Sequence, residues 1–235
     1  LFIVIAFRML PEVVWQMPKY GTFNLHASLL PKYRGAAPLN WAVINGDKET
    51  GVTTFFLKHE IDTGDIIQQK RITIEDSDNV GAVHDKLMTL GADMVIETVD
   101  AIIAGAVTTI PQDQLCQGAA PTPAPKIFKE TCHIDWNSPA EKIHNLVRGL
   151  SPYPAAWSTF EKDGKEHQLK IFETALTRMP ADGAAPGTVK TDKNNIYVAC
   201  ADNYLQILSL QQSGKKRMDS SAFLRGSSLA DATLK

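Results

Sequence analysis

Apolar and polar residues over the first 110 positions follow the periods of strands and helices in alternation. A continuous apolar run over residues 1–6 is typical of a strand buried on both faces of a parallel sheet. Further strands are expected over residues 22–26, 53–58 and 66–74. Helical spacing and helix-start residues predict helices over residues 11–17, 37–44 and 80–103. This alternation predicts an α/β layer.

The pattern changes after residue 110. Residues 111–125 are rich in Gln, Gly, Ala and Pro, which is typical of a semi-extended linker. A helix is expected over residues 139–149. Short strand-like runs separated by turn residues follow at residues 157–161, 169–177, 187–191, 196–199 and 205–210. Strands of this length and spacing predict a small β-barrel or sandwich.

Composition narrows the class of protein only modestly. Of the 235 residues, 44% are hydrophobic, which allows one large or two modest domains. Residues 1–125 carry nine Lys and Arg against 14 Asp and Glu, whereas residues 126–235 carry 15 against 12, so the second half is the basic one. Three cysteines without metal-type spacing, and the absence of an apolar run of about 20 residues, predict a reduced, cytoplasmic protein with no membrane span.

The start of the chain is unusual. It has no initiator Met, and a strand buried on both faces requires neighbouring strands. We therefore expect the chain to be a fragment that lacks earlier strands and helices.

Three polar residues form the most informative constellation in the sequence. Asn24 and His26 are two positions apart at the end of a predicted strand, so their side chains point to one face. A loop bounded by Pro31 and Gly35 follows, and Asp62 arrives in a turn after another strand. A lone His at a strand end, or an Asp in a turn, is usually structural, and only the combination indicates chemistry.

An amide, an imidazole and a carboxylate around one loop suit acyl transfer to an amine. When the amine attacks, the carbonyl oxygen becomes negative and the nitrogen must lose a proton. The Asn24 amide can donate to that oxyanion, which is typically worth about 3–4 kcal/mol of the barrier. His26 can stabilise charge or move protons, and Asp62 can orient the imidazole. The chemistry needs no Ser or Cys nucleophile and no metal, because the amine itself attacks.

The sequence NLHASLLPKYRGAAP, at residues 24–38, resembles the signature of the folate-dependent formyltransferases. A second segment, from residues 50–53 to the DTGD turn at residues 62–65, resembles the other half of that signature. The resemblance implies that Asn24, His26 and Asp62 are the catalytic residues.

The same resemblance implies a formyl donor and the residues that bind it. The donor is 10-formyltetrahydrofolate, used as a co-substrate, and no metal is implied. The FRML sequence near the start of the chain matches the family's pterin-binding loop, and the SLLP loop borders the folate site. The implied folate-binding residues are Phe7, Arg8, Met9, Leu10, Ser28, Leu29, Leu30 and Pro31.

Within this family, the chain is most similar to the branch that formylates methionyl initiator tRNA in translation initiation. The GAAP sequence at residues 35–38 and the QQSGKKRM sequence at residues 211–218 carry this similarity. It implies a partial Rossmann-like catalytic domain over residues 1–110, a linker over residues 111–130, and an OB-like, tRNA-binding β-barrel over residues 131–235. The implied partners are the tRNA and the folate, with a monomer favoured.

Several basic residues are candidates for contact with the tRNA. Lys215, Lys216 and Arg217 form a cluster, Arg148 is isolated, and Arg34 follows the candidate catalytic loop. A solvated turn explains the cluster equally well, and Arg34 can simply cap local carbonyl groups. If these residues bind phosphates, affinity falls steeply as salt is added, because counterions are released on binding.

The sequence departs from the family pattern at two points. Ala27 replaces the usual Gly after the His, and its methyl group can crowd the loop. By domain-size expectation, roughly 90 residues of the Rossmann-like domain are absent. We therefore expect the isolated chain to be inactive or poorly folded, and the parent protein to carry the activity.

Three other functions remain open. A sugar-nucleotide formyltransferase of the 4-amino-arabinose type shares the two-domain layout, and the PLNW sequence at residues 38–41 suits it, but its acceptor does not require a basic C-terminal half. A non-catalytic RNA-binding module has no reason to retain Asn24, His26 and Asp62. A hydrolase that removes formyl from folate with water is disfavoured by the long C-terminal half.

Overall fold

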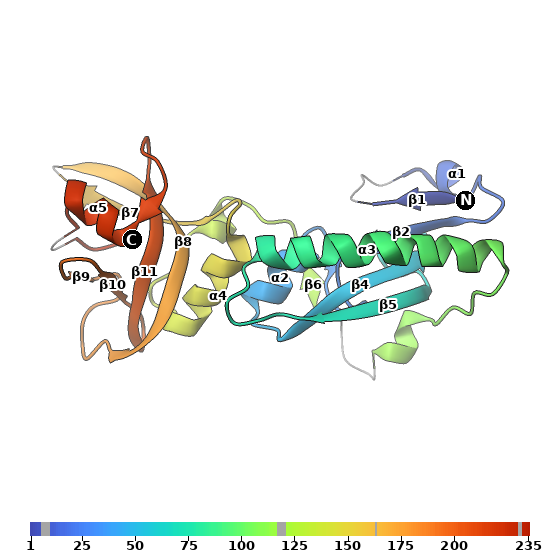
Figure 1. The fold of residues 1–235 in the computed structure, drawn as a ribbon, viewed down its shortest axis with the longest axis horizontal. Helices are drawn as coiled ribbons and strands as arrows, with labels where there is room; N and C mark the ends of the chain where they lie inside the picture. Colours follow the sequence, from blue (N-terminus) through green and yellow to red (C-terminus); the bar gives the residue numbers. More distant parts are fainter. Residues whose placement is uncertain (6–9, 117–120, 163, 230–231) are drawn as a thin grey trace. The chain divides into compact units, whose positions relative to one another are not determined.

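The computed structural model describes residues 1–5, 10–116, 121–162, 164–229 and 232–235 (Figure 1). Contacts divide the chain into two compact units. The first unit contains residues 1–42, 47–78 and 82–126, and the second contains residues 43–46, 79–81 and 127–235. Each unit buries its own cluster of apolar side chains.

The first unit is built on a four-stranded mixed sheet in the order β1-β2-β4-β5. The strands are β1 (Phe2–Val4), β2 (Thr22–His26), β4 (Glu49–Phe56) and β5 (Ile66–Thr73). β1 pairs with β2 in parallel, and the two other pairs are antiparallel. The strand predicted over residues 22–26 is therefore confirmed, and those predicted over residues 53–58 and 66–74 are confirmed with shifted ends.

The long helix α3 (Val80–Ile103) covers one face of this sheet (Figure 1). The hydroxyl groups of Thr98 in α3 and Thr54 in β4 are 3.0 Å apart, and Gly91 lies against the side chain of Leu25 in β2. The helix was predicted over these same residues from its apolar stripe, and it leaves the opposite face of the sheet for other contacts. No helix in the described part of the chain combines the length and the apolar character needed to cross a bilayer.

Two shorter helices complete the regular structure of the N-terminal half. They are α1 (Glu12–Trp15), which begins after Pro11, and α2 (Pro38–Ile44), which is followed by Gly46 in the left-handed conformation at φ +76°. Both begin beside a proline because its fixed φ suits the first helical turn and its missing N–H has no partner there.

The first predicted strand is present as β1, at the edge of the described sheet. Phe2 and Ile3 in it, and Ile5 just after it, are 42%, 44% and 56% exposed. Burial on both faces requires a neighbouring strand on each side, and among the described residues β1 pairs with β2 alone.

The segment expected to be a linker makes specific contacts in the first unit. It contains the 3₁₀ helix η1 (Gln112–Leu115) and the strand β6 (Pro123–Ala124), which pairs in parallel with β3 (Arg34–Gly35). A Cβ atom at Gly35 would lie 2.5 Å from the Ala124 carbonyl oxygen, so this close pairing requires glycine. The Pro and Ala composition that indicates a linker therefore also suits a short strand laid against the loop.

The second unit is an antiparallel sheet in the order β7-β8-β11-β10-β9, with β12 also paired to β11. Its strands are β7 (Ala156–Lys162), β8 (Lys165–Pro180), β9 (Val189–Thr191), β10 (Ile196–Ala199), β11 (Asn203–Gln212) and β12 (Met218–Asp219). The register between β8 and β11 shifts at three places, and such irregularities bend and twist a sheet. The five strands expected from the sequence are present, and β12 is an addition.

Helices α4 (Ala140–Leu150) and α5 (Ser220–Gly226) and the 3₁₀ helix η2 (Glu130–Cys132) complete the second unit. α4 buries Ile143, Val147 and Leu150 in the same apolar cluster as the sheet. Its first turn is preceded by Pro139, which cannot cap it, and the Ala140 N–H instead donates to Asp202 Oδ1 at 2.8 Å. A residue 62 positions away in the sequence therefore supplies the helix cap.

Candidate active site

Strand β2 carries Asn24 and His26 on the face of the sheet that α3 does not cover. Asn24 lies opposite Phe55 and His26 opposite Thr53 in the ladder with β4, whereas Leu25 between them faces α3. The two polar side chains are almost fully buried, with 5% and 6% of their surface exposed. Burial of an amide and an imidazole side by side is costly unless each has a hydrogen-bond partner in the protein or in a bound ligand. This face of the sheet is therefore the candidate for chemistry.

The loop after His26 is held to the sheet by hydrogen bonds. Ser28 Oγ donates to the Lys32 carbonyl at 2.7 Å, and Thr53 Oγ1 donates to the Ser28 carbonyl at 2.6 Å. The Leu30 N–H donates to Thr53 Oγ1, and Gln69 Nε2 donates to the Leu30 carbonyl at 2.8 Å. These bonds give the SLLP loop one conformation relative to β4 and β5.

The hydrogen bonds of His26 determine which of its ring nitrogens is free. Nε2 lies 2.8 Å from the Tyr33 carbonyl oxygen, which can only accept, so Nε2 carries the hydrogen. Nδ1 faces Asp62 Oδ2 at 3.9 Å, which is too long for a hydrogen bond. In the neutral form of His26, an unprotonated nitrogen and a carboxylate oxygen therefore face each other across a short gap.

Tyr33 sets this geometry, and the sequence analysis did not single it out. Its φ of +62° is in the left-handed region, which is rare for a bulky residue and turns its carbonyl toward His26. The conformation is supported by its hydroxyl group, which donates to Asp47 Oδ2 at 3.0 Å, and by its N–H, which donates to the Thr122 carbonyl at 2.6 Å.

Asp62 reaches the site from the turn between β4 and β5. Its side chain is 11% exposed, and Oδ2 accepts the Gly35 N–H at 2.9 Å. Its backbone is left-handed at φ +54°, a conformation that Asp tolerates better than most residues. The turn packs directly on the end of β4, because a Cβ at Gly64 would lie 1.6 Å from the Phe56 carbonyl oxygen.

Asn24 has unused hydrogen-bonding capacity. Its Oδ1 atom is buried without a partner, and no hydrogen bond among the described residues involves its side-chain amide. A buried polar atom left unpaired costs about 1–3 kcal/mol. Thr50 and Ser151 also bury an unpaired oxygen, but Asn24 is the one beside His26 on β2, where a bound molecule would satisfy it.

The residues expected to bind folate have different surroundings. Phe7, Arg8 and Met9 lie outside the described residues, and Leu10 is half-buried. Ser28 and Leu30 are buried inside the loop, whereas Leu29 and Pro31 are partly exposed. The Ser28 hydroxyl is occupied by the Lys32 carbonyl, so its observed contact is within the protein.

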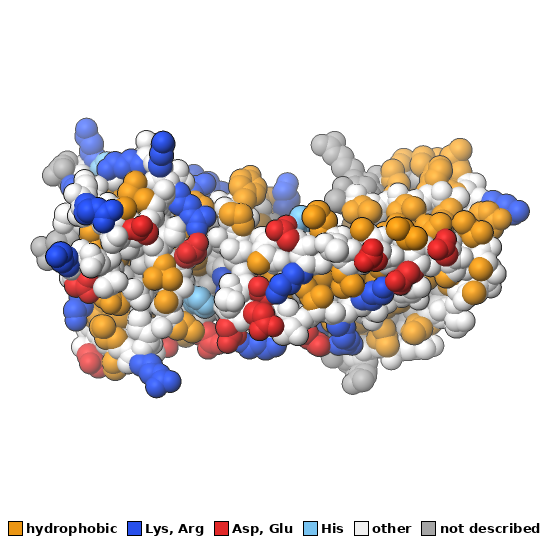
Figure 2. All heavy atoms as spheres, viewed as in Figure 1, with side chains coloured by type: hydrophobic (Ala, Val, Ile, Leu, Met, Phe, Trp, Pro, Cys, Tyr) orange, Lys and Arg blue, Asp and Glu red, His pale blue; other side chains and the backbone are white. Residues whose placement is uncertain are grey.

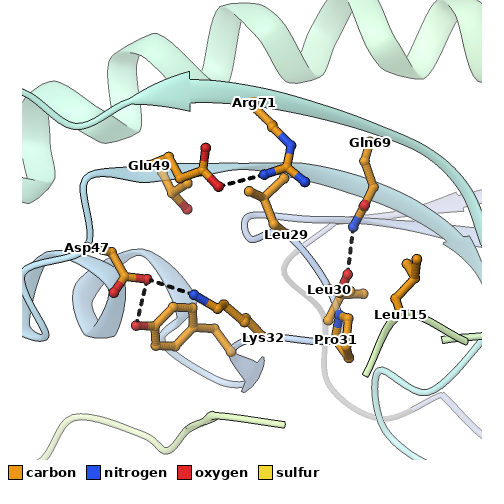
Figure 3. A pocket seen from close by; sticks show the side chains of 11 residues that line it. Leu29, Leu30, Pro31, Lys32, Asp47, Glu49, Gln69, Arg71 and Leu115 are labelled. Atoms are coloured by element: carbon orange, nitrogen blue, oxygen red, sulfur yellow. Dashed lines mark hydrogen bonds and ion pairs between the residues drawn. The ribbon is translucent and has the colours of Figure 1, made fainter. Parts of the chain in front are cut away.

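A cavity of about 280 Å³ lies beside the SLLP loop (Figure 3). Lys32 Nζ lies 3.8 Å from Asp47 Oδ2 at its edge, and Arg71 pairs with Glu49. The complete lining is Leu29, Leu30, Pro31, Lys32, Tyr33, Asp47, Glu49, Thr50, Gln69, Arg71 and Leu115. Asn24, His26 and Asp62 are not among the described residues that line it, so the cavity and the polar face of β2 are separate features.

The basic cluster expected to contact tRNA lies in the turn between β11 and β12. Lys215 and Lys216 are exposed, and Lys215 Nζ donates to Ser227 Oγ at 3.0 Å. Arg217 is held more firmly: Nε donates to Ser209 Oγ, and its guanidinium group lies 4.4 Å from the centre of the Phe172 ring. Other Lys and Arg side chains are visible over the second unit, interspersed with Asp and Glu (Figure 2), so the cluster is one of several basic features on this face.

The two isolated arginines are placed differently from that cluster. Arg34 uses Nε and a terminal nitrogen to donate to Gln112 Oε1 at 3.0 and 2.8 Å. Arg148 is only 7% exposed, and its Nε donates to Asn145 Oδ1. A phosphate contact would require these side chains to change partners or to become exposed, which weakens the expectation that they bind tRNA directly.

Comparison with known proteins matches both halves of the chain to one family. The family model described as formyl transferase matches residues 1–99, and the model of the formyl transferase C-terminal domain matches residues 126–228. A methionyl-tRNA formyltransferase of Bacteroides fragilis is 60% identical over 98% of this chain and 71% of its own length. This chain belongs to the methionyl-tRNA formyltransferase family. A member from Porphyromonas gingivalis is 48% identical over 97% of this chain and 71% of its own length.

Solved structures share the fold at lower identity. A variant of HypX from Aquifex aeolicus has a TM-score of 0.67 at 22% identity, covering 96% of this chain and 40% of that one. WlaRD, a sugar 3N-formyl transferase, has a TM-score of 0.60 at 21% identity, covering 83% of this chain and 66% of that one. Together with membership of the methionyl-tRNA formyltransferase family, they establish a formyltransferase fold with an α/β part and a curled β-sheet.

Proposed function

We infer that this protein transfers a formyl group from 10-formyltetrahydrofolate to the amino group of methionyl initiator tRNA. Family membership at 60% identity supports the acceptor and the donor, and a HypX structure of the same fold is a complex with tetrahydrofolic acid. The observation that carries the proposal is the arrangement of Asn24, His26 and Asp62, which are adjacent on the uncovered side of the sheet although Asp62 is 36 positions after His26 in the sequence.

The unpaired Asn24 amide fits the role of oxyanion donor. The folate supplies a formyl carbonyl, whose oxygen becomes negative when the amine attacks. Among the described residues no hydrogen bond involves the Asn24 side chain, so its Nδ2 hydrogens can donate to that oxygen without first giving up a partner there, while Oδ1, which only accepts, is left for a donor group of the bound molecule. Preorganised donors of this kind stabilise the transition state most effectively, because little reorganisation is needed.

His26 and Asp62 suit the handling of the amine protons. His26 Nδ1 and Asp62 Oδ2 are both acceptors and face each other 3.9 Å apart. Two acceptors at this distance attract the N–H groups of an attacking amine, and the imidazole can take the proton that the amine releases. The carboxylate then stabilises the imidazolium ion, while the Tyr33 carbonyl maintains its orientation through Nε2.

We propose the same folate-binding residues as the family signature implies. Leu10, Leu29 and Pro31 have partly exposed side chains that can contact an aromatic ring system. Ser28 and Leu30 support the loop from within, and their contribution to folate binding passes through the shape of the loop. Phe7, Arg8 and Met9 remain candidates on sequence grounds.

We propose that the C-terminal half holds the tRNA. Lys215, Lys216 and Arg217 are all exposed candidates for phosphate contacts, and the guanidinium group of Arg217 is paired with Glu173. We retain a partial Rossmann-like catalytic domain over residues 1–110, a connecting segment over 111–130 and an OB-like, tRNA-binding domain over 131–235 as the functional division. The connecting segment also has a local role, since its first residues contact the Asp62 turn.

Formyl transfer from 10-formyltetrahydrofolate to methionyl initiator tRNA, measured with the complete gene product, tests the function. We expect transfer in the wild type and a rate about 10²–10⁴-fold lower in His26→Ala, because that variant loses the acid–base group. Turnover with a 4-amino sugar nucleotide and none with the tRNA would assign the protein to the sugar-nucleotide branch instead. Binding of tRNA without any transfer or folate binding would indicate a non-catalytic module.

A further inference from the structure

Gln112 is a buried side chain whose amide group is fully used. It is 2% exposed and lies at the start of η1, within the segment expected from the sequence to be a linker. Its Nε2 donates to the carbonyl oxygens of Asp62 and Gly64, both at 2.8 Å. Its Oε1 accepts from two nitrogens of Arg34. Two hydrogens and two lone pairs are the whole capacity of a primary amide, and all four are engaged.

The four hydrogen bonds of Gln112 flank the hydrogen bond that holds the Asp62 carboxylate. That carboxylate accepts the N–H of Gly35, the residue after Arg34. Gln112 therefore binds the backbone of Asp62, whose carboxylate accepts this hydrogen bond, and the side chain of Arg34, the residue before the donor Gly35. It also spans the turn, because Asp62 and Gly64 are two positions apart and Asp62 has the left-handed backbone conformation at φ +54°.

We propose that Gln112 is a positioning residue that determines where the Asp62 carboxylate lies relative to His26, an inference that rests on the proposed function. The 3.9 Å separation of His26 Nδ1 and Asp62 Oδ2 depends on the turn conformation, since the two residues belong to different elements. Without the amide, the carbonyls of Asp62 and Gly64 lose their partners and the turn can relax. Gln112 acts through Asp62: its side-chain hydrogen bonds go to Arg34 and to the backbone of the turn, and none goes to His26 or to the Asp62 carboxylate.

Gln112→Met tests this role because methionine has a similar length and volume but no polar group at its end. We expect kcat to fall about 10–100-fold, since small displacements of a catalytic group cost rates of this order, with little change in KM for the folate. Thr98→Val is the matched control. It removes another buried hydrogen bond of the first unit, to Thr54, away from the candidate catalytic face, and should leave the transfer rate unchanged.

A double-mutant cycle separates positioning from general destabilisation. If Gln112 acts through Asp62, then Gln112→Met causes no further loss of kcat in an Asp62→Asn background. An equal loss in both backgrounds would overturn the proposal. Gln112→Glu keeps an acceptor for Arg34 but loses both N–H donors to the turn, so it should be impaired as well. Gln112→Glu provides the same test if Gln112→Met does not fold. Full activity of Gln112→Glu would also overturn the proposal.

Hydrogen exchange at the Gly35 amide gives a readout that does not depend on catalysis. Because this N–H donates to Asp62 Oδ2, we expect it to exchange faster in Gln112→Met and unchanged in Thr98→Val. If the wild type transfers no formyl group while Gly35 still responds to Gln112→Met, the proposed function fails and the positioning role stands. If the wild type is active and neither exchange nor rate responds, the positioning role is wrong.

Discussion

The two units use their interiors differently. In the first unit, the candidate site is supported by buried polar side chains. Those of Ser28, Thr53 and Gln112 each donate hydrogen bonds to a loop or a turn. In the second unit, the buried cluster shared by α4 and the sheet is apolar. The Lys and Arg side chains of this unit are mainly at the surface. This difference matches the roles proposed for the two units, which are catalysis in the first and tRNA binding in the second.

Two buried residues of the first unit, Thr53 and Asn24, differ in how many of their polar atoms have a hydrogen-bond partner. Thr53 is saturated, because it donates to Ser28 and accepts from Leu30 and Gln69. Asn24, which shares the same face of the sheet, has no partner among the described residues. A satisfied group stabilises the fold, whereas an unsatisfied one costs stability unless a bound ligand supplies the missing partner.

Among the variants that test this comparison, Asn24→Ala should have the largest effect on the rate. We expect transfer to slow by about 10²–10³-fold, the usual cost of removing one oxyanion donor. Stability should change little, because loss of an unpaired oxygen offsets loss of packing. Single-turnover rates and thermal unfolding measure the two quantities. Thr53→Val is the saturated counterpart and should lower the free energy of unfolding by about 1–3 kcal/mol. Equal destabilisation in both variants would contradict the distinction drawn between the two residues.

A smaller effect is expected from Lys215→Ala combined with Lys216→Ala, which tests the second unit. The affinity for tRNA should fall, and the slope of log affinity against log salt should decrease by about 1 for each lost phosphate contact. The rate at saturating tRNA should not change, since neither lysine is one of the candidate catalytic residues.

Lys165→Ala combined with Lys193→Ala removes the same charge from two other exposed positions of the second unit. Titrations at several salt concentrations compare the two double variants. If both lose affinity and slope to the same extent, the basic surface acts through its total charge and the β11–β12 turn has no special role.

The smallest effect concerns the cap of α4. The Ala140 N–H, followed by other hydrogen bonds, holds the pKa of Asp202 below its usual value. Its charged form therefore stabilises the fold above the unfolded pKa near 3.9, and this contribution disappears as pH falls through the lower folded value. Asp202→Asn should cost a few tenths of a kcal/mol at pH 7, after solvent screening, and nothing in strong acid. Urea unfolding at both pH values measures the difference, and a cost independent of pH would exclude the charge as its cause.

The periodic elements were predictable because their signals are local. The helix over residues 80–103 and the strand over residues 22–26 were predicted with the observed bounds, since an apolar stripe or a strand pattern needs no information from elsewhere. β12 and α5 were not predicted. Both are short, and α5 depends on Asp219, which caps it by accepting the Ala222 N–H.

The candidate site was predictable only in part. Asn24 and His26 share a face because of the strand period, and the signature indicated Asp62 as their partner. Gln112 gave no signal, because its surroundings have the composition of a linker. Tyr33 also gave none, because a left-handed tyrosine is unfavourable locally and is maintained by Asp47 and Thr122.

By itself, the sequence determined the family, the order of the longer helices and strands, and the residue types available for catalysis, because these follow from local patterns and a contiguous signature. Only the tertiary structure decided which nitrogen of His26 faces Asp62, that Asn24 Oδ1 has no partner among the described residues, and that Gln112 donates to the Asp62 turn. These properties depend on distances of a few ångströms between segments far apart in the chain, and no local pattern of residues encodes such distances.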